Sequence, residues 1–245
     1  MASARYTRYI SKEDNKEPEH HEMTNEEKWS NFWFYHKWHI VAIICAAAMI
    51  GMFVYELVTR VQYDYTIGLI TEQTLPSGTV EALKLELERV CDDFNGNGKV
   101  DIDIMEYNFS ISGDNIIDPN MHAANITRLM GDIQTGQSML FLTDNVKGVQ
   151  EGQMFLAYND GTTPKTDAKI DYNNMGRKWT DCPLLKELNL GYATNFDGEQ
   201  GALIQDIMKS FTLVKRAYYD TSIEPKEKLA PYYKSSMALF DKLTE

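Results

Sequence analysis

An uncharged apolar run near the amino terminus constrains this chain more than any other feature. Residues 40–55 read IVAIICAAAMIGMFVY, and residues 56–58 extend the run to about the 20 residues that a helix needs to cross a bilayer. Trp29, Trp33 and Trp38 come just before it, and their amphipathic rings favour the membrane interface. A helix buried in a soluble core would carry charged residues within the apolar run and would lack this aromatic flank. We therefore expect contact with the lipid bilayer through residues 39–58, within an aromatic-flanked transmembrane segment at residues 29–60.

The flanks of this run indicate an uncleaved signal anchor and its orientation. A long polar segment precedes the run and no small-residue cleavage site follows it, which does not fit a secretory signal peptide. Six Lys or Arg residues precede the run, whereas after Arg60 none occurs until Lys84. The positive-inside rule then predicts a single-pass protein of the cell membrane, with residues 1–28 as a disordered cytoplasmic tail and residues 61–245 outside the cell.

The charge of the chain belongs almost entirely to the expected outer domain. The net charge is −12, and residues 61–245 carry 17 Lys or Arg against 28 Asp or Glu, which is −11. Nucleic-acid binding is not expected, because it needs a clustered basic surface. An acidic domain attracts cations or basic partners, although solubility alone also explains the acidity.

Residues 61–245 show the alternation of strands and helices that is typical of an α/β fold. Strands are predicted at residues 65–71, 99–109 and 138–143, and helices at residues 79–91, with Thr79 as N-cap, and 121–134. This order favours one three-layer domain with a mainly parallel sheet flanked by helices. Residues 159–181 read as loop, and further amphipathic helices are predicted at residues 199–219 and from Pro225 onward.

The second predicted helix and third predicted strand carry a family resemblance. Residues 126–144, ITRLMGDIQTGQSMLFLTD, resemble the segment of type II extracellular solute-binding proteins in which a helix ends at a Gly and the next strand delivers an Asp to the pocket edge. The chain is also similar to single-span, outward-facing proteins of Gram-positive bacteria that carry a truncated version of this domain. The resemblance covers roughly residues 65–144. Solute-binding proteins close two lobes on a ligand, and residues 61–245 are too few for two full lobes.

Asp144 is the predicted ligand or partner residue at the edge of the sheet. It follows the third strand, and ligands of α/β sheets bind beyond the carboxyl ends of strands. The alternative is a structural Asp that closes the strand or caps the next helical turn.

Residues 93–101 reproduce the first nine positions of a calcium loop of the EF-hand or dockerin kind. The predicted ligands are four side-chain oxygens and one backbone carbonyl, supplied by Asp93, Asn95, Asn97, Asp101 and, through its carbonyl, Lys99. Ile104 stands at the twelfth position, where a bidentate acid normally completes such a site. Asn-Gly-Asn-Gly is also a favourable tight connection between a helix and a strand, so a loop without metal is the alternative.

Cys91 and Cys182 are the two cysteines of the expected outer domain. In an oxidising compartment they can form a disulfide that ties the first helix to the late loop. Their apolar neighbours Val90, Pro183 and Leu184 fit two buried free thiols equally well.

No motif of catalysis stands out, and we expect a protein that is not an enzyme. His122 is the one histidine beyond residue 60, and no nucleophile motif lies near it. The expected function is that of a membrane-anchored extracellular binding or assembly domain, with a small extracellular ligand or a membrane protein as partner. Two alternatives stay open. One is a cell-surface hydrolase that uses a carboxylate pair such as Asp101 and Asp103, and the other is a structural accessory subunit of a membrane transporter or envelope complex.

Overall fold

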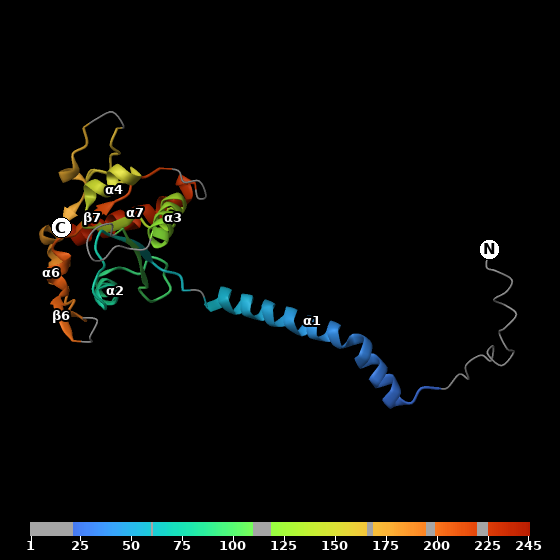
Figure 1. Cartoon of the computed structure of the whole chain (residues 1–245). Helices are drawn as coiled ribbons and strands as arrows, with labels where there is room; N and C mark the ends of the chain where they lie inside the picture. Colours follow the sequence, from blue (N-terminus) through green and yellow to red (C-terminus); the bar gives the residue numbers. More distant parts are fainter. Residues whose placement is uncertain (1–21, 60, 110–118, 166–168, 195–198, 220–224) are drawn as a thin grey trace, which may run out of the picture. The chain divides into compact units, whose positions relative to one another are not determined.

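The computed structural model of the chain describes residues 22–59, 61–109, 119–165, 169–194, 199–219 and 225–245 (Figure 1). By its contacts the chain divides into two compact units, Met1–Arg60 and Val61–Glu245.

The first unit holds one long helix, α1 (Asn25–Thr59). It begins in a capping box, in which the Thr24 amide donates to Glu27 Oε2 at 2.8 Å and the Glu27 amide donates to Thr24 Oγ1 at 3.4 Å. Residues 25–28 are therefore helical, although the sequence interpretation assigned them to a disordered tail that ends at residue 28. Of the rest of that predicted tail, residues 1–21 lie outside the described residues, and residues 22–24 have no regular secondary structure.

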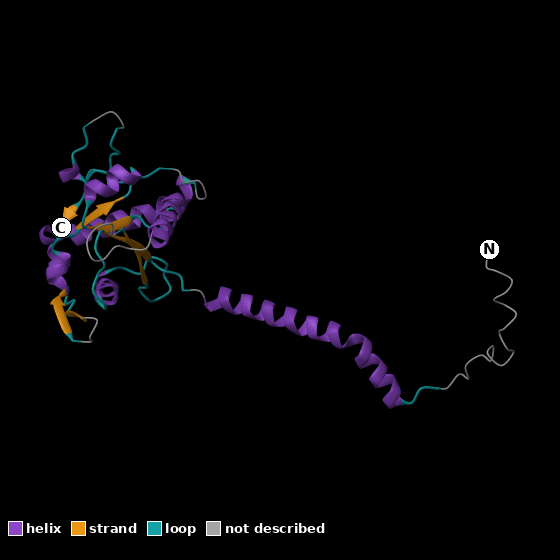
Figure 2. Ribbon diagram, viewed as in Figure 1, coloured by secondary structure: helices purple, strands orange, loops and turns teal. Residues whose placement is uncertain are grey.

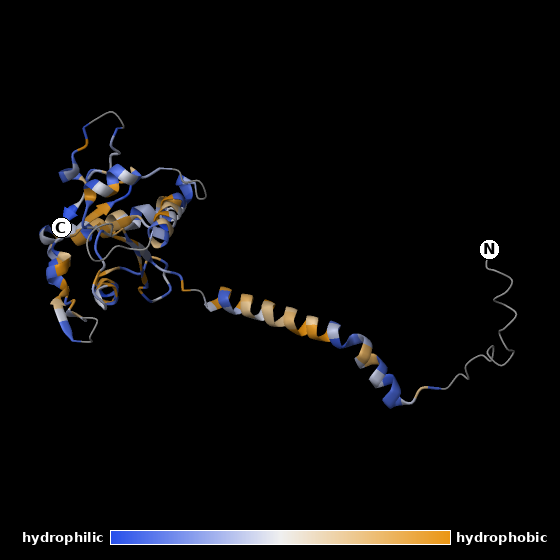
Figure 3. Cartoon of the chain, viewed as in Figure 1, coloured by the Kyte–Doolittle hydropathy of each residue, from blue (hydrophilic) through white to orange (hydrophobic). Residues whose placement is uncertain are grey.

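Among the described residues, α1 is the one helix that is long and apolar enough to cross a membrane. Its middle part is uniformly hydrophobic (Figure 3), and none of its residues is buried in the protein. A helix that is apolar on all sides and unburied is suited to lipid rather than to a protein core. The described residues thus hold one candidate membrane anchor, at the place that the sequence predicts.

The second unit is built on a five-stranded sheet of order β2-β1-β3-β7-β4. Strands are orange and helices purple in Figure 2. The strands are β1 (Tyr65–Thr71), β2 (Ile102–Asn108), β3 (Leu140–Thr143), β4 (Arg177–Lys178) and β7 (Thr212–Lys215). Strand β1 pairs in parallel with both β2 and β3, whereas β7 is antiparallel to β3 and β4. The prediction of an α/β fold with a mainly parallel sheet is confirmed.

Helices cover both faces of this sheet. The longer ones are α2 (Thr79–Val90), α3 (Pro119–Thr135), α4 (Val146–Gln153) and α7 (Lys226–Thr244). One core cluster joins Leu69 of β1 to residues of α2 and α7, and the other joins Ile70 of β1 to residues of α3 and α4. Because successive side chains of a strand point to opposite faces, the two clusters lie on the two sides of the sheet. The shorter elements are α5 (Pro183–Glu187), α6 (Ile204–Met208) and a small antiparallel sheet of β5 (Tyr192–Thr194) and β6 (Gln200–Leu203).

The predicted amphipathic helix at residues 199–219 is wrong. This segment forms β6, the short helix α6 and strand β7. The apolar positions Leu203, Ile207 and Phe211 have helical spacing, but Phe211 begins a run of strand-forming residues, FTLV. Strand β7 inserts between β3 and β4, where it buries Leu213 and Val214. Pairing with two strands distant in sequence therefore overrides the local pattern.

The predicted N-cap of α2 is also displaced by one residue. Gly78 is the N-cap, with φ of 85°, and Thr79 is the first helical residue. The left-handed conformation at the cap favours glycine, which explains why the chain turns at residue 78. The final helix α7 begins after Pro225, as the sequence predicts.

Candidate ligand-binding site

The carboxyl ends of β1 and β3 lie side by side at a reversal of strand order. From β1 the chain runs to β2 on one side and then to β3 on the other. Ile70 near the end of β1 is paired with Thr143 at the end of β3. In open α/β sheets such a point leaves a crevice beyond the strand ends, where ligands bind. The residues that leave the two strands here are Glu72 and Asp144.

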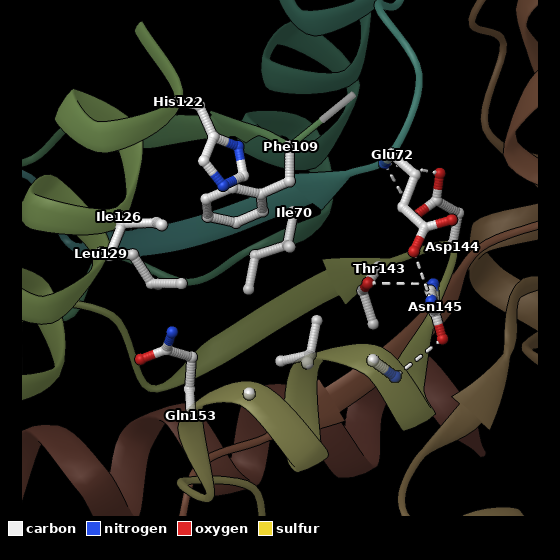
Figure 4. A pocket seen from close by; sticks show the side chains of 13 residues that line it. Ile70, Glu72, Phe109, His122, Ile126, Leu129, Thr143, Asp144, Asn145 and Gln153 are labelled. Carbon is white, nitrogen blue, oxygen red and sulfur yellow. Dashed lines mark hydrogen bonds between the residues drawn. The ribbon is translucent and has the colours of Figure 1, made fainter. Parts of the chain in front are cut away.

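A network of hydrogen bonds joins these two strand ends to helix α4 (Figure 4). The Glu72 amide donates to both carboxylate oxygens of Asp144, and the Asn145 side-chain amide donates to Glu72 Oε1. Asn145 is the N-cap of α4, since its Oδ1 accepts from the Gly148 amide at 2.8 Å. The N-cap is therefore Asn145 and not Asp144. The Asp144 carboxylate instead accepts hydrogen bonds from the amide of Glu72, the residue that follows β1.

A cavity of about 310 Å³ opens next to this network, between α3 and α4. Its walls are mostly apolar, and they come from both strand ends, from both helices and from the residue after β2. The lining includes Ile70, Phe109, Ile126, Leu129, Val149 and Gly152. Its volume lies at the lower end of the range of small-molecule sites, about 300–1,000 Å³.

The polar groups of the cavity gather at two ends (Figure 4). Glu72, Asp144 and Asn145 lie at one end, and His122 lies toward the other, beside Phe109. The His122 and Phe109 rings meet edge to face with centroids 5.7 Å apart. Within the described part of the chain, His122 Nδ1 is buried without a hydrogen-bond partner. An apolar cavity with a few convergent polar groups is the usual form of a ligand site.

A second hollow adjoins the same carboxylates on the side of α6. It measures about 430 Å³ and is lined by Glu72, Asp144, residues 73–76 and residues around Phe211. Glu72 and Asp144 therefore border both spaces. This position makes them accessible from two directions at one edge of the sheet.

The carboxyl group of Asp144 has a perturbed acidity. Burial raises its pKa above 3.8 and the nearby charge of Glu72 adds to this, while the hydrogen bond from the Glu72 amide partly offsets both effects. A half-buried carboxylate with a raised pKa lacks full solvation of its charge. Such a group is stabilised by a cation or a hydrogen-bond donor that enters the site.

The predicted calcium loop is closed by its own side chains. Asp93 accepts from the amides of Gly96 and Gly98 at 2.6 and 2.8 Å. Asn95 Oδ1 accepts from the Asn97 amide, and Asn97 Oδ1 accepts from the Lys99 amide. These bonds give the side-chain oxygens a structural role that needs no ion. Among the described residues, no three His, Cys, Asp or Glu side chains are grouped as metal ligands, and calcium binding stays a prediction.

Asp64, which the sequence interpretation overlooked, anchors this loop. Its side chain is fully buried, and Oδ1 accepts from the amides of Phe94 and Asn95 at 2.9 Å each. Oδ2 accepts from the Asp101 amide at 2.8 Å. One carboxylate thus holds both ends of the loop beside the start of β1.

Cys91 and Cys182 are free thiols in this structure, and both are buried in the larger core cluster. Burial raises the pKa of Cys91 to about 12 and that of Cys182 to about 11. The Cys182 thiol donates to the Lys178 carbonyl at 3.2 Å. Of the two alternatives that the sequence left open, the structure has the buried free thiols.

The sequence identified only part of the candidate site. Asp144 was predicted from its place after a strand, and the same rule points to Glu72, which follows β1 directly. Phe109 and the apolar residues of α3 and α4 are indistinguishable from core residues in the sequence. The carboxylate pair Asp101 and Asp103 lines neither of the two cavities described above.

Comparison of the chain with protein-family models, with curated proteins and with solved structures finds no match.

Proposed function

We propose that the chain is a membrane-anchored extracellular binding domain, without catalytic activity, that takes a small ligand at the edge formed by Glu72 and Asp144. The observation that carries this proposal is the cavity of about 310 Å³ beyond the carboxyl ends of β1 and β3. The reversal of strand order at this edge supports it, because ligands of open α/β sheets bind at such points. The resemblance of residues 126–144 to a solute-binding lobe agrees with the same edge.

A blocked-cavity variant tests this proposal directly. Gly152 lines the cavity, and a Cβ built there meets no atom within 4 Å, so Gly152→Leu introduces a side chain without a clash at its first carbon. Gly131→Leu is the matched control, because Gly131 has the same open surroundings on α3 but does not line the cavity. Both substitutions replace glycine within a helix, so their intrinsic effects on helix stability are similar.

The measurement is ligand-observed NMR of a small-molecule library with the full chain in phosphatidylcholine nanodiscs. We expect library members to bind to the wild-type and Gly131→Leu chains and not to Gly152→Leu. Bound molecules recovered unchanged after long incubation support a non-catalytic role, whereas cleaved molecules support the hydrolase alternative. A library in which no member distinguishes Gly152→Leu from its control contradicts the proposal.

The extracellular placement is a separate part of the proposal. It rests on the six basic residues before the apolar run and on their scarcity after it. Protease added to intact cells is expected to remove residues 61–245 and to leave an amino-terminal tag protected. Protection of the larger unit in intact cells would contradict this orientation.

Calcium stabilisation of the loop at residues 93–101 is tested by calorimetry. A weak extracellular site has a dissociation constant of about 10⁻⁴–10⁻³ M. A saturable heat in this range that is lost in Asp93→Ala supports calcium binding. Equal heats from the wild-type and variant chains contradict it.

A further inference from the structure

The carboxylates at the edge of the cavity have no cationic partner in the described part of the chain. Among the described residues, neither Glu72 nor Asp144 forms an ion pair with Lys, Arg or His. The nearest basic residue along the chain, Lys147, pairs instead with Glu151 at 3.8 Å. Two acidic side chains therefore border one cavity, and the described residues balance their charges with hydrogen bonds from amides.

Between these carboxylates and His122, the cavity has the opposite character. Ile70 and Leu129 are buried at its base, and Phe109, Ile126 and Val149 complete an apolar wall. Water in such a space gains few hydrogen bonds, so an apolar group displaces it favourably. The site thus joins an apolar chamber to an anionic edge (Figure 4).

We propose that this cavity binds a small organic cation, with an apolar body between α3 and α4 and a protonated amine against Glu72 and Asp144. This inference rests on the proposed function, and it names the chemical class of the ligand. Charge complementarity selects the head group, because the ammonium supplies the counter-charge that the described residues do not provide at this edge. The net charge of −11 on residues 61–245 further favours the approach of cations over anions.

Three probes of one shape separate the contributions of charge and apolar surface. They are 2-phenylethylamine, 2-phenylethanol and phenylacetate, each small enough for a cavity of about 310 Å³. The probes are titrated into the full chain in phosphatidylcholine nanodiscs and followed by saturation-transfer NMR. The Gly152→Leu chain in the same nanodiscs corrects for partition of the probes into lipid.

We expect the amine to bind about tenfold more tightly than the alcohol, since a charge-assisted hydrogen bond is roughly twice as strong as a neutral one. The carboxylate probe is expected not to bind. Asp144→Asn should reduce the advantage of the amine, because one of the two carboxylates is lost, while the affinity for the alcohol stays the same. Glu151→Gln is the matched control, because it removes one acidic charge from α4 outside the cavity lining, and it should preserve the advantage.

The outcomes distinguish this inference from the proposed function. Equal binding of the amine and the alcohol, or an amine advantage that Asp144→Asn does not reduce, overturns the cationic ligand and leaves a binding cavity. If other library members bind and none of these probes does, the cationic ligand is likewise overturned and the binding cavity remains. Absence of any ligand that is sensitive to Gly152→Leu overturns both.

Discussion

The backbone amide of Glu72 donates to both carboxylate oxygens of Asp144, at distances of 3.0 and 3.2 Å. These two residues lie 72 positions apart in the sequence and meet because β1 and β3 are neighbours in the sheet. The contact fixes the geometry of the edge at which the candidate site lies. Its removal should therefore affect both the stability of the sheet and the shape of the cavity.

Asp144→Ala is expected to reduce the free energy of unfolding by about 1 kcal/mol, because the Glu72 amide loses its acceptor but remains near solvent. Asp144→Asn should lose less, since its side-chain oxygen still accepts one hydrogen bond. Urea unfolding measures the difference in a chain whose Trp29, Trp33 and Trp38 are replaced by Phe. The remaining tryptophan, Trp179, is fully buried and reports on the second unit alone. Equal free energies of unfolding for Asp144→Ala and Asp144→Asn would show that the hydrogen bonds from the Glu72 amide to Asp144 do not stabilise the protein.

The same residue should give the protein a specific pH dependence. Because the pKa of Asp144 is raised above 3.8 by burial and then by Glu72, the folded state holds this proton more tightly than the unfolded state. As pH rises from 3.8 through the folded pKa, the wild-type chain should lose stability relative to Asp144→Asn, which cannot ionise. Below 3.8 the difference should be constant. Urea midpoints between about pH 3 and pH 7 measure this difference, and one that changes in the opposite direction contradicts the assignment.

Asp64 should contribute more to stability than the better exposed acids of its loop. Asp64→Ala leaves the amides of Phe94, Asn95 and Asp101 without their acceptor, and a hydrogen bond to a charged group is worth about 1.5–3 kcal/mol. We expect a loss of about 2–3 kcal/mol, because part of the loop reaches solvent.

Asp93→Ala is the matched control for this prediction. Its carboxylate also accepts two amides, but the residue is exposed, and we expect a loss of about 1 kcal/mol. Hydrogen exchange locates the effect. The amides of Phe94, Asn95 and Asp101 should exchange faster in Asp64→Ala, whereas unchanged exchange at all three would show that Asp64 does not anchor the loop.

The elements up to β3 could be predicted from the sequence because their signals are local. Strand β1 has the predicted bounds, and α2, β2, α3 and β3 lie within a few residues of theirs. The interpretation failed at residues 199–219, where Leu203, Ile207 and Phe211 are spaced as in a helix. The strand-forming run FTLV is a local signal for a strand there, but it is short, and the pairing with β3 and β4 that stabilises residues 212–215 cannot be read from the local sequence.

Of the candidate site, the sequence predicts the edge residue Asp144 but not the cavity beside it. A polar residue directly after a buried strand indicates the functional edge of an α/β sheet, and this identified Asp144. The cavity itself depends on how α3 and α4 pack around Phe109, which periodicity does not specify. In the sequence, His122 is a single histidine without a catalytic motif near it. Its place opposite the carboxylates follows from the tertiary structure.

The centre of the sheet depends on a glycine. A Cβ built on Gly68 of β1 lies 2.2 Å from Phe141 Cδ1 and 2.4 Å from Cε1, closer than non-bonded carbons approach. The Phe141 ring is itself held edge to face against Phe155, with centroids 4.9 Å apart. Gly68→Ala should therefore lower the free energy of unfolding by about 1–3 kcal/mol through overpacking.

Gly131→Ala is the control, because a Cβ there meets nothing within 4 Å, and it should be neutral or stabilising by up to about 1 kcal/mol.

A double-mutant cycle tests whether the Phe141 ring is the cause of the destabilisation by Gly68→Ala. Phe141→Leu alone creates a cavity and should destabilise, but combined with Gly68→Ala it should cost less than the sum of the two single changes. Urea unfolding of the four chains, followed by Trp179 fluorescence, measures the coupling. Additive effects would show that Gly68 is required for a reason other than the Phe141 ring.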